Sequence, residues 1–166
     1  ILSATQMVAP SVMVMELYKI VQQNEFWAQI VISARSIVIA FSLAMFFGCV
    51  IALILHALPR LRDSLEPLIA SYYALPIFVL YPLLIVLLGM NQFPIIAIGF
   101  LYAVMAVIIG TLNGLDRIPS VLMRTGRICR LSPVQQATYI SIPAAAPYVF
   151  TGAKLAFGYS ITGVLG

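Results

Sequence analysis

"PLIASYYALPIFVLYPLLIVLLGMNQFPIIAIGFLYAVMAVIIGTLNGL", residues 67–115, contains no Asp, Glu, Lys, Arg or His. A membrane-spanning helix needs about 20 apolar residues, so this run is too long for one crossing and suits two. The Gly, Asn and Pro residues of the short segment GMNQFP, Gly89–Pro94, are typical of a turn. The stretch therefore predicts two spans, Leu68–Leu88 and Pro94–Leu115, joined by that turn.

The composition of the whole chain indicates a membrane protein. Of its 166 residues, 63% are hydrophobic and 8% are charged, whereas soluble domains have roughly 45–50% and 25%. Two further segments without charges, residues 36–55 and 131–153, predict a first span at Val31–Leu55 and a last span at Ala144–Gly166. These apolar runs are continuous rather than alternating, which does not fit barrel strands. We therefore expect an all-α, polytopic membrane helical bundle.

Arginines concentrate in the connections after the first and third predicted spans. They supply most of the net charge of +4, and short cytoplasmic loops of membrane proteins carry such an excess. We expect both connections in the cytoplasm and the uncharged GMNQFP turn on the opposite side. A nucleic-acid-binding function does not fit charges placed in this way. The arginines concerned are Arg60, Arg62, Arg117, Arg124, Arg127 and Arg130.

Residues 1–29 form a segment of different character. Apolar residues recur there at helical spacing, with Glu16 and Lys19 between them. This pattern predicts an amphipathic helix at the outer membrane interface, which we prefer to a ligand-binding role. Residues 30–166 then form the transmembrane domain, and we expect the chain to be incomplete at both ends.

The sequence contains no catalytic motif. The phosphate-binding loop GxxxxGK[ST] and the motifs HExxH and GxSxG are absent, and Cys49 and Cys129 lack metal-ligand spacing. His56, at a predicted cytoplasmic helix end, is expected to serve packing or a helix-end charge rather than a proton relay. We therefore expect no enzyme, no metal site and no bound cofactor. An ion-coupled carrier is disfavoured because no acid lies inside a predicted span.

The second predicted span carries two prolines, Pro76 and Pro82. Proline frees a backbone carbonyl, which is tolerated at membrane depth only where protein or a water-filled cavity satisfies it. With its hydroxyl groups, this span is either the wall of a translocation pathway or a kinked packing helix with buried tyrosines. The candidate pathway residues, including one in the last span, are Ser71, Tyr73, Pro76, Tyr81 and Ser160.

The connection from Asp116 to Pro143 is long for a compact bundle, and such loops are usually functional or disordered. Apolar residues recur along it on one face, so we expect two short amphipathic helices with a break near residues 130–133. Ser132 suits an N-cap, with Pro133 at the first helical position. The polar face, with Gln135, Gln136 and Thr138, is the expected docking surface.

Here the chain resembles a family, the permeases of binding-protein-dependent ATP-binding-cassette (ABC) importers, in the branch that serves nitrate, sulfonate and taurine. The resemblance rests on the proline spacing of Ile142–Pro147 and on the glycines and lysine of Thr151–Gly158. The EAA loop of that family has an acidic-Ala-Ala triplet and then a glycine thirteen residues before the proline. This chain departs from that pattern, with Arg124–Gly126 at the triplet and Arg130 at the glycine position.

The resemblance implies a permease subunit that forms the pathway for a small anionic or organic solute in a multi-pass position in the bacterial inner membrane. Four to five of six expected helices are present, and residues 116–143 are a cytoplasmic coupling loop, in which a proline-marked turn redirects the chain into the last span. The implied partners are two cytoplasmic ATPases that use ATP and Mg, an external solute-binding protein, and a second permease chain, which we expect to differ from this one. The implied ATPase-coupling residues are Arg124, Thr125, Gly126, Arg130, Leu131, Ser132, Gln135, Gln136 and Pro143.

Two alternatives stay open at this point. The altered triplet also fits a non-transporting or regulatory membrane subunit whose coupling loop has degenerated. The loop could also be an interfacial helix that only anchors the bundle, although an anchor does not explain the downstream proline and glycine pattern.

Overall fold

The structure is a computed structural model that describes residues 10–74 and 76–166. Every regular element in these two ranges is helical, and none is a strand, which confirms the predicted all-α fold. The chain divides into two compact units between Arg35 and Ser36. Each unit is described separately.

The first unit contains α1, Pro10–Val21, and the beginning of α2, Asn24–Ala57. Lys19 Nζ lies 2.7 Å from Glu16 Oε1 on α1. Trp27 Nε1 donates a hydrogen bond to the carbonyl oxygen of Val21 at 2.9 Å, so the indole ties the end of α1 to the start of α2. The predicted amphipathic helix is thus present over residues 10–21, whereas residues 1–9 lie outside the described residues. Its position at a membrane interface stays a prediction.

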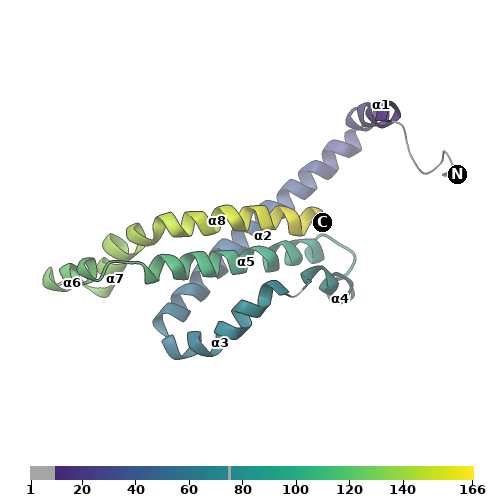
Figure 1. Cartoon of the computed structure of the whole chain (residues 1–166). Coiled ribbons are helices and arrows are strands. Elements are labelled where there is room, and N and C mark those ends of the chain that lie inside the picture. The colour runs from purple at the N-terminus through teal and green to yellow at the C-terminus, as the bar shows by residue number, and fades with distance from the viewer. Residues whose placement is uncertain (1–9, 75) are drawn as a thin grey trace. The chain divides into compact units, whose positions relative to one another are not determined.

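In the second unit, α5 and α8 form a close antiparallel pair (Figure 1). α5 extends over Phe93–Asp116 and α8 over Ile142–Leu165. Their backbones approach so closely that a Cβ atom added to Gly110 would lie 2.7 Å from the Cα of Gly152. Small residues at helix crossings permit this approach in membranes, where van der Waals packing holds helices together.

The part of α2 in the second unit also packs through small residues. Buried small residues recur at every fourth position of this part: Ser36, Ala40, Ala44, Gly48 and Ala52. They lie on one helical face because four residues make slightly more than one turn. A Cβ atom on Gly48 would lie 2.7 Å from the side chain of a valine on α5. The first and third predicted spans therefore form a packed core with the last one.

Two of the described helices, α2 and α5, are long and apolar enough to cross a membrane. The second predicted span is not one continuous helix. It consists of α3, Pro59–Ser71, two 3₁₀ turns, η1 over Tyr72–Ala74 and η2 over Ile77–Leu80, and α4, Tyr81–Leu88.

The two prolines of this segment behave differently. Pro76 caps η2 and lies at the break, as predicted. Pro82 was expected to interrupt the span, and this expectation is wrong, because it lies in the first turn of α4. A proline there is tolerated, since the first backbone N–H groups of a helix have no intrahelical acceptor.

The turn predicted at residues 89–94 is confirmed. Gly89 ends α4 with a φ of 83°, a conformation that glycine adopts without steric penalty. Asn91 Nδ2 donates to the carbonyl oxygen of Leu88 at 2.7 Å, and the Phe93 amide donates to Asn91 Oδ1 at 2.8 Å. Asn91 therefore connects the last turn of α4 to the first turn of α5.

Candidate functional site

The connection between α5 and α8 begins with α6, Ser120–Ile128, which ends in a fully bonded C-terminal motif. The Arg130 amide donates to the carbonyl oxygen of Arg127 and the Leu131 amide donates to that of Gly126, both at 3.0 Å. This pair of bonds is the Schellman motif, which places one residue in the left-handed conformation. That residue is Arg130, with a φ of 50°. The position where the resembling family has a glycine thus adopts the conformation that favours glycine.

Ser132 begins the next helix with a reciprocal pair of hydrogen bonds. Its Oγ accepts from the Gln135 amide at 3.3 Å, and Gln135 Oε1 accepts from the Ser132 amide at 2.9 Å. These bonds form a capping box, which satisfies two backbone donors at the helix start. The predicted N-cap at Ser132 and the predicted break near residues 130–133 are therefore confirmed.

The helix that starts here does not end before the last span. α7, Pro133–Gln136, continues through η3, a π-helical segment over Ala137–Ser141, directly into α8. The resemblance implied a turn at Pro143, and this expectation is wrong. Proline cannot supply the backbone N–H of a regular helical turn, and wider π-helical turns accommodate such a defect without ending the helix.

α6 packs against η3 through Gly126. This glycine is buried, and a Cβ atom on it would lie 2.8 Å from Ile140 Cδ1. Gln136 Nε2 lies 3.4 Å from Met123 Sδ on the same inner side of α6. The helices of the connection are therefore fixed to each other and, through the continuous helix, to α8.

The predicted coupling residues thus occupy two different environments. Gly126 is buried, and Leu131 and Gln136 are partly buried between the helices. Thr125 is exposed, but its hydroxyl donates to the carbonyl oxygen of Val121 at 3.0 Å. The remaining exposed members, besides the capping pair, are Arg124, Arg130 and Pro143.

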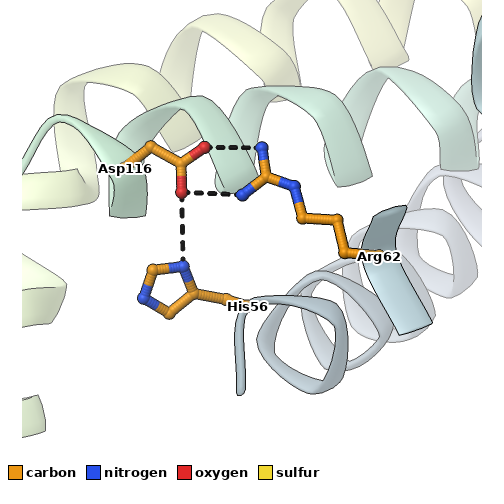
Figure 2. Close-up of polar contacts among 3 residues, drawn as sticks. All are labelled: His56, Arg62 and Asp116. Carbon is orange, nitrogen blue, oxygen red and sulfur yellow. Dashed lines mark hydrogen bonds and ion pairs between the residues drawn. The ribbon is translucent and has the colours of Figure 1, made fainter. Parts of the chain in front are cut away.

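A group of three polar side chains joins the start of this connection to two other helices (Figure 2). Arg62 on α3 donates two hydrogen bonds to the carboxylate of Asp116, the last residue of α5, at 2.9 and 2.7 Å. His56 Nδ1, near the end of α2, lies 3.4 Å from Asp116 Oδ1. The hydrogen bonds to the Asp116 carboxylate raise the pKa of Arg62.

Sequence reasoning did not identify this group. The sequence predicts His56 at a helix end, Arg62 in a cytoplasmic connection and Asp116 at the start of a loop. The local signal is that all three lie in the connections predicted on the same side of the membrane. Paired arginine and carboxylate groups form contacts of specific geometry through two parallel hydrogen bonds, so the group connects α3 to the start of the connection.

The structure does not bring the candidate pathway residues together. Ser71 donates to the carbonyl oxygen of Pro67 within α3, and Ser160 is buried between α5 and α8, where it donates to the carbonyl oxygen of Ala156. Tyr81 lines a cavity of about 240 Å³ between the start of α4, α5 and the end of α8. Pro76 is exposed, and the side chain of Tyr73 lies outside the described part of the structure.

The sequence of this part of the chain matches a known protein family. Residues 44–166 match the family described as "Binding-protein-dependent transport system inner membrane component". The match includes α5, the connection and α8, and most of the described core.

Individual relatives are similar to the same part of the chain. The bicarbonate transport system permease protein CmpB of Synechocystis is 30% identical over 133 residues, which are 80% of this chain and 47% of that protein. The nitrate import permease protein NrtB of Leptolyngbya laminosa is 26% identical over 83% of this chain and 49% of its own length. The taurine transport system permease protein TauC of Escherichia coli is 24% identical over 80% of this chain and 48% of its own length. The chain spans about half the length of these relatives.

Proposed function

Since this chain belongs to the family of inner-membrane components of binding-protein-dependent transport systems, we propose that it is a permease subunit of an ABC importer. The family match over residues 44–166 carries this proposal. The solute is small and anionic or organic, in keeping with relatives named for bicarbonate, nitrate and taurine. The partners are two cytoplasmic ATPases that use ATP and Mg, an external solute-binding protein and a second, different permease chain in the bacterial inner membrane.

Residues 116–143 serve as the coupling loop in this proposal. α6 is fixed to η3 at Gly126, and η3 is continuous with α8. α8 in turn packs closely along α5. Displacement of α6 by an ATPase would therefore move α8 and α5 as one body, because packed cores shift between discrete arrangements rather than deform continuously.

The group of Asp116, Arg62 and His56 connects one more helix, α3, to the body formed by α5 and α8. α3 has no buried residue along its length. Arg62 holds it to the base of the loop, and Tyr72, in the 3₁₀ turn that follows α3, donates to the carbonyl oxygen of Leu101 on α5 at 2.7 Å. A helix attached at both ends follows the motion of α5, so α3 would move together with α5 and α8.

The experiment is transport by the full-length protein in proteoliposomes with its ATPases, its partner permease and its binding protein. Bicarbonate, nitrate and taurine are tested as solutes. We expect ATP-dependent uptake of one of them, and none with an ATPase variant that cannot hydrolyse ATP. The chain without ATPases should hydrolyse no ATP, because its sequence has no phosphate-binding loop.

One observation favours a second function, that of a non-transporting or regulatory subunit. Arg124 and Arg130 stand where the resembling family has an acid and a glycine. A complex that assembles and hydrolyses ATP but accumulates no solute would support this second function and contradict the first.

A further inference from the structure

The outward side of the α5–α8 connection carries charge of one sign. Arg124, Arg127 and Arg130 are exposed, and none of them is among the ion pairs of the described residues. No Asp or Glu occurs between residues 117 and 166. The acid that precedes the connection, Asp116, is already bonded to Arg62. The three guanidinium groups therefore lack an acidic partner within this segment.

The polar side chains around these arginines are already used inside the segment. The hydroxyls of Thr125 and Thr138 donate to backbone carbonyls one turn earlier in the chain. Ser132 and Gln135 form the capping box, and Gln136 contacts Met123. These bonds use one group of each side chain and leave other groups, such as the Gln135 amide nitrogen, able to contact a partner beside the arginines.

Two large apolar side chains lie exposed beside the arginines. Val121 is 68% exposed and Ile128 is 82% exposed. They are seven residues apart on α6, two helical turns, and therefore share one face. Arg124 lies between them at spacings of three and four, so that face combines an apolar stripe with a positive charge.

The position of this face favours a partner in the aqueous phase. α7, η3 and α8 contain 4, 5 and 24 residues in one continuous helical stretch, which is about 50 Å long at 1.5 Å per residue. The hydrocarbon core of a bilayer is about 30 Å thick. Figure 1 shows α6 and α7 at the end of the α5–α8 pair, where α5 ends and α8 begins. α6 and α7 thus lie beyond the end of the α5–α8 pair.

We propose that residues 120–131 bind an acidic groove on a cytoplasmic protein partner, with an apolar floor for Val121 and Ile128. Asp and Glu side chains on its rim pair with Arg124, Arg127 and Arg130. Guanidinium groups suit this role because they bind carboxylates through two parallel hydrogen bonds. The identity of the partner as the ATPase rests on the proposed function, whereas the acidic chemistry of the groove rests on the arginines alone.

The test measures binding of the ATPase subunit to the full-length protein in phosphatidylcholine nanodiscs. Raising NaCl from 50 to 300 mM should weaken binding at least tenfold, because charge pairs at an exposed rim are screened by salt. The double variant R124E/R127E should weaken binding at 50 mM NaCl at least tenfold, and R124A/R127A should weaken it less. The matched control R60E reverses an exposed arginine on α3 and should leave binding unchanged. Circular dichroism checks that each variant keeps its helix content.

Three outcomes would overturn the proposal, and they are distinguishable. ATPase binding that is unchanged in R124E/R127E would refute the acidic groove and leave the proposed function intact. Absence of ATPase binding by the unmodified protein would refute the proposed function together with this inference. A polarity-sensitive fluorophore on I128C that shifts to the blue only when phosphatidylglycerol is added to the nanodiscs would show that the segment binds anionic lipid instead.

Discussion

Replacing Arg130 by glycine should stabilise the end of α6, although it removes a side chain from the exposed surface. Arg130 holds a φ of 50°, and this left-handed conformation costs a residue with a Cβ atom about 1–2 kcal/mol. Glycine has no such penalty, but its greater freedom in the open state offsets about 0.4–1 kcal/mol of the gain. The net stabilisation should be about 0.5–1 kcal/mol, which is roughly a 2–5-fold smaller opening constant.

Hydrogen exchange of the Leu131 amide measures this opening directly, because that amide donates to the carbonyl oxygen of Gly126 in the motif. After correction for the intrinsic rates, Arg130→Gly should exchange about 2–5-fold more slowly than the unmodified protein. Arg130→Ala removes the charge but keeps a Cβ atom, so its exchange should stay close to that of the unmodified protein. Arg127→Gly places glycine inside the helix and should accelerate exchange, since it costs about 1 kcal/mol there. Equal rates for the Gly and Ala variants at position 130 would refute the reasoning.

Three further predictions concern packing, the ion pair and topology. Gly110→Ala should lower the unfolding free energy in detergent by about 1–3 kcal/mol, because the new Cβ atom would lie 2.7 Å from the backbone of α8; Gly158→Ala, which meets nothing within 4 Å, should not lower it. Asp116→Asn should cost about 0.5–1 kcal/mol in the same titration, since the ion pair is about one-third exposed, and a loss that persisted unchanged in 1 M NaCl would argue against an electrostatic origin. Single cysteines at Asn91 and Arg127, in a background without the native cysteines, should label from opposite sides of the membrane, and labelling from one side would contradict the topology.

The arginines at positions 124 and 130 illustrate two separate consequences of one sequence departure. At position 130 the departure is a matter of backbone conformation, because the chain keeps the left-handed turn without the glycine that suits it. At position 124 it is a matter of surface charge, since that side chain is exposed. The exchange and binding experiments separate these two consequences. Hydrogen exchange measures the opening of the backbone, and the binding assay measures the affinity for the partner.

The sequence alone determined the features that depend on neighbouring residues. Uncharged apolar runs predicted the helices α2, α5 and α8, and the residues of GMNQFP predicted the turn that Gly89 and Asn91 form. Ser132 was predicted as an N-cap because capping acts over only three residues. These signals are local, so no knowledge of the tertiary structure was needed to use them.

The tertiary structure decided which distant residues meet. Arg62 and Asp116 are 54 positions apart, and nothing in either local pattern specifies that they pair. Gly126 was considered for its place in a motif, but its contact with Ile140 gives it a packing role. Gln135, predicted on the polar face, also caps the helix that begins at Ser132, because the hydrogen-bond geometry of the folded segment, and not the polarity of a residue, determines which groups pair within the chain.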